Sequence, residues 1–595
     1  MELGIIGNCQ YSALINRKGN VSWLCWPRFD SSFVFGGLLD EEKGGYFEIC
    51  GDNDLEGEQS YIGNTNVLRT LFETDDGSFE LIDFAPRFQQ HNRYFKPKAL
   101  IRIVRPLSGK PRCKVRIDAK LDYGLESSKQ SMESNHIKFF GYNSPMRLTS
   151  NAPLTYIESC TGFTLDKTYY FALTYGQPIE ADLREVCRQF YEKTCYYWDT
   201  WIRHSCLPTQ FQKEIIRSAL VLKLHQYEDT GAIIAATTTS IPEADGTERN
   251  WDYRYCWIRD AMFSLSALQR LTQFEELEKF ISYLHNLVEN SKDRDYFIQP
   301  VYAIDGNSSL VETIKDHLQG YLGNQPVRVG NQAYEHLQYD VYGEILIAIS
   351  PIFLDERFKG EQSRLPLQIV GKLIDQIERY LTAPDAGLWE FRGKAQVHTF
   401  TLLLNWAGLL VGEKIYNIAN IKKQEQRCRE LKEKISQYIF DHAWNSKVEG
   451  FTQAVGSDDY DASLLMMINM GFLDKEDPRA HRLVDDIMEN LSHSSGLLHR
   501  YVAKDDFGST ENAFLICSFW LVEALARLDR RKEAMELLTQ LLTYRNHLGL
   551  YSEDVDPKTG KLWGNFPQTY SHVGLINAVF ALFPNRGSLY LDDES

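Results

Sequence analysis

The chain lacks the features that mark several large classes of protein. Its 595 residues contain no run of about 18 apolar residues, so we expect no membrane-spanning helix and no membrane partner. The first residues show no basic stretch followed by an apolar one, which argues against a signal peptide and predicts a cytoplasmic location. The net charge of −17 disfavours nucleic acid as a partner, because phosphate binding needs clustered Lys and Arg.

Short motifs for metals, nucleotides and acyl transfer are also missing. The 11 cysteines are scattered singly and form no Cys-x-x-Cys pair, so we expect reduced and mostly buried thiols. No His and Cys spacing suits a metal site. The chain has no P-loop, no Gly-x-Gly-x-x-Gly and no Gly-x-Ser-x-Gly. The sequence therefore predicts neither a bound metal nor a cofactor.

Aromatic residues, in contrast, are abundant: 32 Tyr, 32 Phe and 11 Trp. A large hydrophobic core accounts for many of them. A second explanation is a site that stacks the flat apolar faces of sugars or of nucleic-acid bases. The acidic balance disfavours bases, so sugars are the ligand class that the composition leaves open.

Residues 1–180 are predicted to form an antiparallel β-sandwich. From Cys113 to Tyr123 apolar and charged residues alternate, and this period of two indicates a strand with one buried face. Gly, Asn and Asp separate the apolar runs, as turns require. Further strands are expected at Val67–Glu73, Phe79–Phe84, Ala99–Val104 and Phe163–Leu173.

The hydrophobic period becomes helical after residue 180. Residues 181–208 predict a linker helix, and residues 209–595 contain about twelve helical segments of two alternating kinds. The first kind is amphipathic with a charged outer face: 211–227, 274–291, 364–382, 415–440, 477–491 and 531–543. The second kind is apolar nearly all round: 260–271, 333–353, 398–412, 459–472, 511–527 and 571–583.

A helix that is apolar on every side must be buried on every side. Six such helices alternating with six half-exposed ones describe an inner ring wrapped by an outer ring. Residues 209–595 are therefore predicted to form an (α/α)6 barrel that carries the catalytic site. The alternative is an α-solenoid, but no repeat of fixed period is visible.

The least expected residues gather in the loops that enter the inner helices. In such a barrel these loops open at one end, and here they are rich in Trp, Tyr, Arg, Asp and Glu. The six loops are 250–260, 331–344, 386–394, 455–463, 496–512 and 549–572. Aromatic walls with carboxylates and Arg suit a sugar, whose faces stack and whose hydroxyls take charge-assisted hydrogen bonds.

Two glutamates in these loops are candidates for the acid and the base of glycoside hydrolysis. Glu390 lies between Trp389 and Phe391, and burial against aromatic rings would keep its carboxyl protonated as a proton donor. Glu553 lies in the polar run Ser-Glu-Asp, so we expect it to stay ionised and to activate water. On sequence alone, Asp554 and Asp556 compete with it equally for this role.

Each candidate also has a purely structural explanation. Arg259 and Asp260 could form a salt bridge at a helix start, where an acidic residue is favoured. Tyr253 and Trp257 could pack inside the barrel, and a single Glu is most often a solvated surface charge. The prediction of a sugar site therefore depends on the whole set of loops.

Five of these segments resemble, in the same order, the active-site segments of glycoside hydrolase family 15, the glucoamylase, glucodextranase and trehalase family. They are NWDYRYCWIRDA (250–261), QYDVYGE (338–344), GLWEFRG (387–393), GLLHRY (496–501) and SEDVDPKTGKLWGNFPQTYSHVGLI (552–576). Residues 7–40 resemble the N-terminal β-domain of prokaryotic members, so the resemblance covers nearly the whole chain. It implies a β-sandwich, a linker helix and an (α/α)6 barrel, in agreement with the hydrophobic patterns.

The resemblance implies an inverting, exo-acting α-glucoside hydrolase of the glucoamylase type, which releases β-glucose from the non-reducing ends of short α-glucans. It implies Glu390 as the general acid and Glu553 as the general base. The residues expected to bind the sugar are Tyr253, Trp257, Arg259, Asp260, Trp389 and Arg500. Segment 26–30 is expected to reach over the mouth of the site.

The chain departs from the pattern of many family members in two places. The base segment reads Ser-Glu-Asp where Glu-Gln is common, and this second carboxyl is expected to raise the pKa of the pair. Glu335 and His336 stand where smaller or uncharged residues are frequent. Both departures bear on linkage preference rather than on the type of reaction.

Three other functions compete with this one. An α,α-trehalase on the same scaffold would differ in the second sugar subsite. A non-catalytic sugar-binding regulatory protein would not need both Glu390 and Glu553. A lyase or phosphorylase on an (α/α)6 barrel is disfavoured, because the net negative charge of the chain would repel an anionic substrate. The expected partner is a small oligosaccharide, and the sequence does not reveal whether the chain forms an oligomer.

Overall fold

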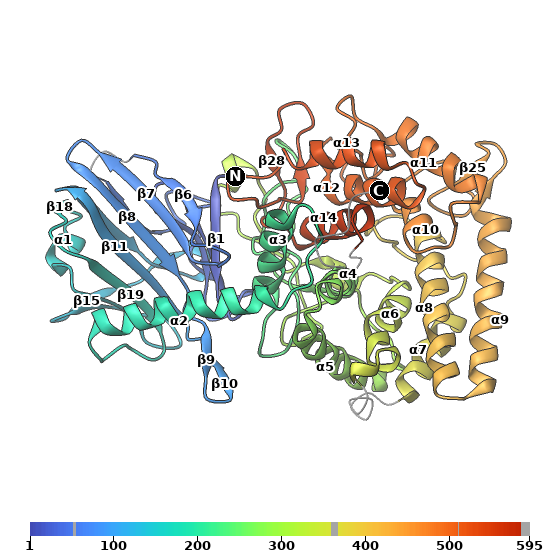
Figure 1. The fold of residues 1–595 in the computed structure, drawn as a ribbon, viewed down its shortest axis with the longest axis horizontal. Helices are drawn as coiled ribbons and strands as arrows, with labels where there is room; N and C mark the ends of the chain where they lie inside the picture. The colour runs from blue at the N-terminus through green and yellow to red at the C-terminus, as the bar shows by residue number, and fades with distance from the viewer. Residues whose placement is uncertain (52–54, 359–366, 510, 585–595) are drawn as a thin grey trace.

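The computed structural model describes residues 1–51, 55–358, 367–509 and 511–584. Figure 1 shows a sheet-rich N-terminal part on the left and a helical part on the right. Helix α2 (Leu183–Arg203) runs along the sheet towards the helical part. This is the predicted combination of a β-domain, a linker helix and a helical barrel. The boundaries at residues 180 and 208 stay predictions.

The larger sheet of the N-terminal domain has eight antiparallel strands in the order β15-β16-β17-β19-β11-β8-β7-β6. Their bounds in that order are Gln130–Met132, His136–Phe139, Met146–Ser150, Tyr169–Tyr175, Ala99–Gly109, Gly77–Phe84, Leu68–Thr74 and Glu58–Tyr61.

A second layer packs against one face of this sheet. It contains the strands β1 (Leu3–Gly7), β2 (Ser12–Asn16), β3 (Val21–Cys25) and β4 (Phe33–Phe35), and the three-stranded set β18 (Phe163–Thr164), β12 (Arg112–Asp118) and β5 (Tyr46–Gly51). Apolar side chains of both layers form one core, among them Ile15, Phe47, Phe79 and Leu100. The predicted antiparallel β-sandwich is confirmed.

Two strand predictions differ in detail. The run Cys113–Tyr123 is not one strand, because β12 ends at Asp118 and a short pair, β13 (Lys120–Leu121) with β14 (Glu126–Ser127), follows it. The run Phe163–Leu173 divides between the two layers, since β18 pairs with β12 whereas β19 lies in the large sheet. Both runs have the hydrophobic period of a strand, but each is interrupted in the fold. In the second run the chain passes from one layer of the sandwich to the other, so the first strand has to end.

The outer face of the large sheet is covered by α2. Asp182 caps this helix by accepting the backbone N–H of Glu185 at 2.8 Å. Cys187 and Phe190 of the helix pack on the apolar side chains that the sheet turns outward, such as Ile101. The linker is therefore part of the β-domain's packing and not a free tether.

The C-terminal part is a double ring of helices. The inner ring contains α4 (Ile258–Arg270), α6 (Val341–Leu354), α8 (Thr399–Ile418), α10 (Met466–Asn469), α12 (Leu515–Arg527) and α14 (Thr569–Leu582). Each inner helix contacts the next, and α14 contacts α4, so the ring closes. The outer helices are α3 (Gln212–His225), α5 (Phe274–Asn290), α7 (Leu367–Arg379), α9 (Lys422–Tyr438), α11 (Pro478–Leu491) and α13 (Arg531–Leu541).

Two glycines allow the inner helices α6 and α8 to cross closely. A Cβ atom on Gly343 would lie 2.2 Å from the carbonyl oxygen of Leu404, and one on Gly408 would lie 2.6 Å from the Cα atom of Gly343. Neither contact is sterically possible, so any larger residue at these positions would push the two helices apart.

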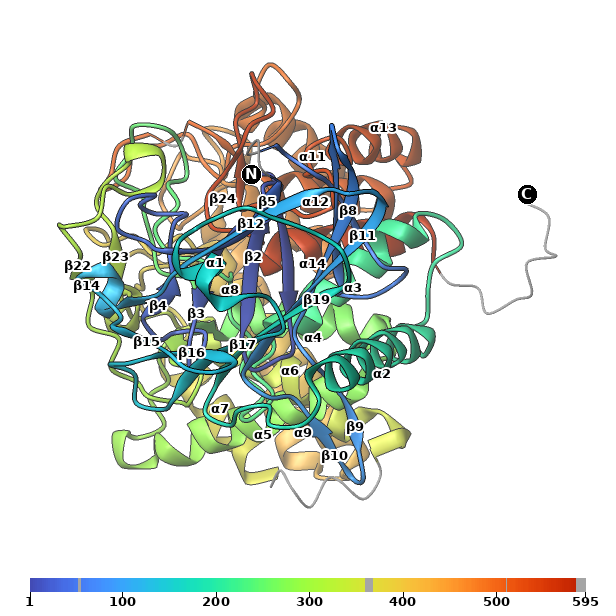
Figure 2. The same cartoon turned by 90° about the vertical axis from the view of Figure 1, so that its left-hand side faces the viewer.

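Helix α3 departs from its prediction as a half-exposed outer helix. Every residue from Arg217 to His225 is buried, because the β-domain covers the face that was expected to meet water. Lys223 lies inside this interface and pairs with Glu276 at 2.6 Å, with both side chains fully buried. In Figure 2 the β-domain faces the viewer with the barrel behind it.

Other helix bounds also changed. The segment predicted at 459–472 is only a 3-10 turn (Ala462–Leu465) followed by the single turn of α10. The segment predicted to start at residue 333 becomes an α-helix only at Val341, after a separate 3-10 turn. Residues 364–366 of the predicted 364–382 helix lie outside the described residues.

Eight of the 11 cysteines are buried, as predicted for most of these thiols. Over the part of the chain that the structure describes, no helix is long and apolar enough to cross a bilayer. The cytoplasmic location stays a prediction.

Candidate active site

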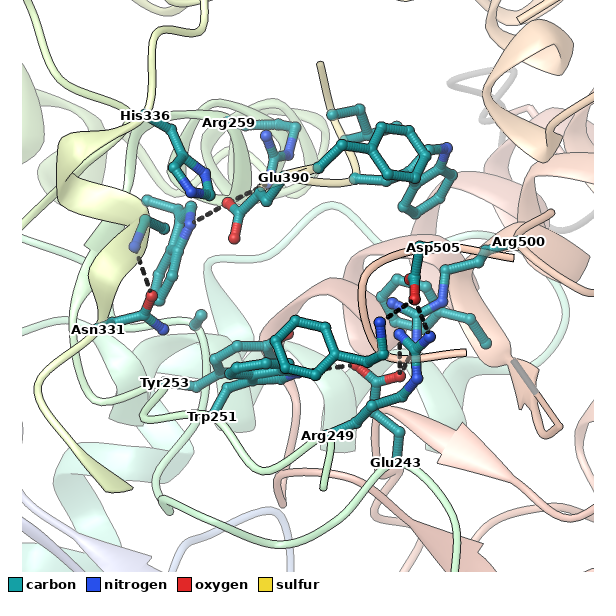
Figure 3. A pocket seen from close by; sticks show the side chains of 18 of the residues that line it. Glu243, Arg249, Trp251, Tyr253, Arg259, Asn331, His336, Glu390, Arg500 and Asp505 are labelled. Carbon is teal, nitrogen blue, oxygen red and sulfur yellow. Dashed lines mark hydrogen bonds and ion pairs between the residues drawn. The ribbon is translucent and has the colours of Figure 1, made fainter. Parts of the chain in front are cut away.

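One cavity opens where the loops enter the inner helices, and charged and aromatic side chains line it (Figure 3). Seven of the eight predicted site residues line it: Tyr253, Trp257, Arg259, Asp260, Trp389, Glu390 and Arg500. The eighth, Glu553, is not part of the lining but accepts a hydrogen bond from Tyr253, which is. The structure thus brings together residues from segments up to 300 positions apart.

Glu390 projects into this cavity from the loop before α8. Its Oε1 accepts the indole N–H of Trp257 at 2.7 Å and lies 3.5 Å from the guanidinium of Arg259. The amide of Gln338 donates to the same oxygen at 3.4 Å. The expected hydrophobic enclosure is absent, because 24% of the side chain is exposed and Trp389 turns away to donate to Asp461 at 2.6 Å.

The backbone of Glu390 is strained. Its φ of 61° lies in the left-handed region, which non-glycine residues rarely occupy. Hydrogen bonds from its own N–H to Gly387 O and from Phe391 N–H to Ala386 O form the turn that imposes this conformation. Strain of this kind costs on the order of 1–3 kcal/mol and tends to occur at functional sites.

Glu553 is almost fully buried, just before β27 (Asp554–Val555). Its Oε1 accepts the hydroxyl of Tyr253 at 2.8 Å, and its Oε2 accepts the backbone N–H of Asn565 at 3.3 Å. Gly564 packs so closely on it that an added Cβ would lie 2.5 Å from the Cβ of Glu553. The carboxyl group is therefore held firmly, and Tyr253, which does line the cavity, is its direct neighbour.

The expectation that Glu553 lies in a polar, ionising environment is wrong. Burial is the main cause that raises the pKa of Glu553 to about 8, and the nearby carboxylate of Glu243 acts in the same direction. Arg500 and the hydrogen bond from Tyr253 act in the opposite direction. The pKa of the adjacent Asp554 is raised too, again mainly by burial, so the prediction that the pKa of the pair is raised has the right direction.

Arg259 lines the cavity and is surrounded by buried carboxyl groups. Its Nη1 donates to Gln338 at 3.0 Å, and its Nε lies 3.8 Å from Asp260 in the first turn of α4. Burial raises the pKa of Asp260 to about 6. Asp340 and Glu344, four residues apart at the start of α6, are also buried near Arg259 and have raised pKa values. Arg259 is thus the cation that this acidic cluster faces.

The residue that sequence reasoning missed is Glu243. This buried side chain lines the cavity, accepts the indole N–H of Trp251 at 3.0 Å, and pairs with Arg500. Arg249 lies 3.7 Å from the same carboxylate and pairs with Asp505. No motif or period marks Glu243 in its segment, so only the fold reveals it.

A strap formed by residues 502–508 joins two walls of the cavity. On one side Arg249 pairs with Asp505 and donates to Gly508 O at 3.0 Å. On the other side Asp506 accepts the backbone N–H groups of Arg392 at 2.7 Å and Gly393 at 3.1 Å.

Not every predicted loop reaches the cavity. No residue of 455–463 or 26–30 lines it. The expectation that segment 26–30 covers the mouth is therefore wrong: Arg28 pairs with Asp305 at 2.5 Å, and the carbonyl of Phe29 faces Arg254 behind the loop 250–260. The described residues contain no cluster of three or more His, Cys, Asp or Glu side chains suited to a metal.

Comparison with known proteins identifies the family of the chain. Residues 210–580 match the model of "Glycosyl hydrolases family 15", and residues 2–159 match the model "Trehalase-like, N-terminal". A trehalase of Thermoplasma volcanium is 31% identical over 587 residues, which cover 96% of this chain and 92% of that protein. A trehalase of Mycolicibacterium smegmatis is 30% identical over 607 residues, which cover 97% and 90% of the two chains.

The fold has a counterpart among solved structures. A bacterial glucoamylase complexed with acarbose superimposes with a TM-score of 0.68 at 14% identity, over 98% of this chain and 93% of that one. At this identity the likeness concerns the fold, and it supports the barrel and the β-domain. The family match covers well over half of the chain, and the chain therefore belongs to glycosyl hydrolase family 15.

Proposed function

We propose that this glycoside hydrolase cleaves α,α-trehalose with inversion at one anomeric carbon. The observation that carries the proposal is its similarity to trehalases, at about one residue in three, over nearly the whole length of both chains. The glucoamylase-type reaction on short α-glucans is the alternative, and it has the likeness of fold in its favour.

In the proposed reaction Glu390 donates its proton to the oxygen that joins the two sugars. Glu553 takes a proton from a water molecule, whose oxygen forms a new bond to the anomeric carbon as the glycosidic bond breaks. One sugar leaves as β-glucose and the other keeps its α configuration. The raised pKa of Glu553 would also suit a proton donor, so the pKa does not assign the two roles. We assign them from the match of the two segments to those of the family.

The part of the cavity around Arg259 and Asp260 suits the sugar that is attacked. Arg259 and Asp260 present charged hydrogen-bonding groups there, and Trp257 and Tyr253 provide adjacent rings with centroids 5.3 Å apart. Charged groups bind sugar hydroxyls strongly, and the rings pack against the apolar faces of the sugar. A non-catalytic regulatory protein would not need the strained Glu390.

The strap 502–508 favours a short substrate. Because it ties Arg249 to the backbone of Arg392 and Gly393, it restricts the space beyond the first sugar. A second glucose has partners there in Arg392, Asp506 and His336, which line the cavity. A long glucan would have to pass the strap, whereas a disaccharide would not.

Proton NMR of the reaction products tests the proposal. The purified chain is mixed with trehalose, maltose, maltotriose or isomaltose, and the anomers are followed as they form. Trehalose hydrolysis with equal initial amounts of α- and β-glucose supports it. Formation of β-glucose from the non-reducing end of the other sugars, with trehalose untouched, supports the glucoamylase alternative. Absence of any hydrolysis, with glucose binding seen by calorimetry, supports the regulatory alternative.

A further inference from the structure

The loop 250–260 supplies a hydrogen bond to each candidate catalytic glutamate. Tyr253 donates to Glu553 at 2.8 Å, and Trp257 donates to Glu390 at 2.7 Å. Between these two residues lies Arg254, whose side chain points the other way, out of the barrel and into the β-domain. This residue contacts neither glutamate and does not line the cavity.

Arg254 is fully buried and connects the two domains. Its Nη1 donates to the carbonyl of Ser31 at 2.7 Å, and its Nη2 donates to the hydroxyl of Tyr123 at 3.0 Å. Both acceptors belong to the β-domain. On the barrel side its guanidinium pairs twice with Asp252, at 2.9 and 2.7 Å. A buried charge with all of these partners is held in a single geometry.

Asp252 extends this connection to a residue of another segment that lines the cavity. Its Oδ2 also accepts the backbone N–H of Gly330 at 3.2 Å, and its carbonyl accepts the side-chain amide of Asn331 at 3.2 Å. Asn331 lines the cavity. The residues on both sides of Tyr253 are therefore fixed by groups that depend on the β-domain.

A second connection runs from the β-domain to the other oxygen of Glu553. Trp23 of β3 is buried and donates its indole N–H to the carbonyl of Thr237 at 2.9 Å. The next residue, Thr238, donates to the side-chain oxygen of Asn565 at 2.9 Å and accepts the backbone N–H of Phe566 at 2.9 Å. The N–H of Asn565 in turn reaches Oε2 of Glu553 at 3.3 Å.

We propose that Arg254 and Trp23 are positioning residues through which the β-domain sets the orientation of Glu553, one through Tyr253 and the other through Asn565. The β-domain is then a working part of the active site, although none of its residues lines the cavity. The inference rests on the proposed function in that it takes Glu553 as the base.

The groups that face Glu553 determine what a disturbed orientation does. Glu243 raises the pKa of Glu553, whereas Arg500 and the hydrogen bonds from Tyr253 and Asn565 lower it. Weakening either hydrogen bond therefore moves the titration of Glu553 to higher pH. A mere loss of folding stability would lower the melting temperature without moving this titration.

The test uses the full chain with the variants Arg254→Lys and Trp23→Phe. Lysine keeps the charge but loses the fork that binds Asp252, Ser31 and Tyr123 together, and phenylalanine keeps a ring but loses the indole donor. The control is Lys96→Met, which removes an ion pair between Lys96 of the β-domain and Asp229 of the barrel at 2.5 Å, away from the loop 250–260.

We expect kcat/KM at pH 7 to fall about tenfold in each variant, and the acidic limb of its pH profile to move up by about half a unit or more. The control should keep both quantities. If the two variants fold and match the wild type in rate and pH profile, the proposal is overturned. It is also overturned if both fail to fold, because stability alone would then explain the contacts.

A readout that does not need activity separates this inference from the proposed function. Carbon-13 NMR of glutamate carboxyl groups follows the titration of Glu553 directly, with Glu553→Gln to assign its signal. If the wild type does not hydrolyse trehalose, the proposed function fails, but a higher titration midpoint in Arg254→Lys and Trp23→Phe still supports the positioning role. An unchanged midpoint overturns it.

Discussion

Tyr253 donates its hydroxyl to Oε1 of Glu553 at 2.8 Å, and the two residues are 300 positions apart in the sequence. This bond stabilises the charged form of a carboxyl group whose pKa burial raises to about 8. A general base has to be ionised before water attacks, so kcat/KM of the wild type should rise with pH until the region of that pKa. Tyr253 and Glu243 act on this value in opposite directions.

Tyr253→Phe should move the acidic limb of kcat/KM to higher pH. The variant keeps the ring but loses the hydrogen bond that lowers the pKa of Glu553, so more of this carboxyl is protonated at a given pH. We expect a loss of about tenfold at pH 6 and a smaller loss at pH 9. Initial rates of glucose release across this range check it.

The matched control for that experiment is Tyr283→Phe. Tyr283 is a buried tyrosine of the same barrel, and its hydroxyl donates to Ala303 O at 2.8 Å without lining the cavity. Its loss should leave the pH profile in place. An equal shift in both variants would mean that Tyr253 acts through general packing.

Glu243→Gln should move the same limb to lower pH. Glu243 raises the pKa of Glu553 by its negative charge, and the neutral amide removes that repulsion. The positive charge of Arg500 is then no longer neutralised by Glu243. Its attraction to the Glu553 carboxylate increases, which also lowers the pKa of Glu553. Rates measured between pH 5 and 9 should show a downward shift of about one unit.

Glu523→Gln provides the comparison for Glu243→Gln. Glu523 is a buried glutamate of α12 that pairs with Arg527 at 2.9 Å and does not line the cavity. Its loss changes the net charge of the chain equally, so a shift seen in both variants would point to a long-range charge effect. A shift to higher pH in Glu243→Gln would contradict the assignment of the limb to Glu553.

The sequence predicts the double ring well, because the pattern that marks an inner helix lies within the residues of that helix. A helix surrounded by other helices must be apolar on every side, and α12 and α14 show this in their own residues. The same reasoning fails for α3, whose charged residues imply an outer face in water. Lys223 is buried there because the β-domain and Glu276 cover it, and these contacts come from distant parts of the chain.

The site shows the same division between local and distant causes. The segment around Glu390 is recognisable because its neighbours belong to one loop. The environment of Glu553 cannot be recognised from its own segment. Tyr253 and Glu243, which influence its ionisation, come from other loops. The residues next to Glu553 in sequence are polar, yet tertiary packing buries them, and Asp554 is only 1% exposed.

Glu344→Gln should stabilise the fold at pH 8. Glu344 is buried beside the carboxyl group of Asp340, and burial together with Asp340 raises its pKa well above the ordinary value. The folded state therefore binds more protons than the unfolded state. Stability is lost as the pH rises through the unfolded pKa of about 4.3 towards the folded value. The amide avoids this loss.

Thermal unfolding checks this sign. The melting temperature of Glu344→Gln should exceed that of the wild type by a few degrees at pH 8, and the two should converge near pH 4. Glu413→Gln should do the reverse at pH 8, because Glu413 is paired with Arg429 and Lys432 and its pKa is lowered. A lower melting temperature for Glu344→Gln at pH 8 would refute the argument.

Asp506→Ala should widen the range of substrates. The variant frees the backbone N–H groups of Arg392 and Gly393 and so releases one end of the strap 502–508. We expect KM for trehalose to rise about tenfold and the relative rate on maltotriose to increase. Asp458→Ala removes an exposed carboxylate of the loop 455–463, outside the cavity, and should change neither value. Unchanged selectivity in Asp506→Ala would mean that the strap does not limit the substrate.

Replacing each candidate glutamate by glutamine should separate the acid from the base. With trehalose both Glu390→Gln and Glu553→Gln should lose about 10²–10⁴-fold in rate, because each variant lacks one proton transfer. With α-glucosyl fluoride the results should differ. Fluoride leaves without protonation, so Glu390→Gln should keep most of its rate on this substrate, whereas Glu553→Gln still lacks the group that activates water. The reverse pattern would exchange the two roles, and it would agree with the raised pKa of Glu553.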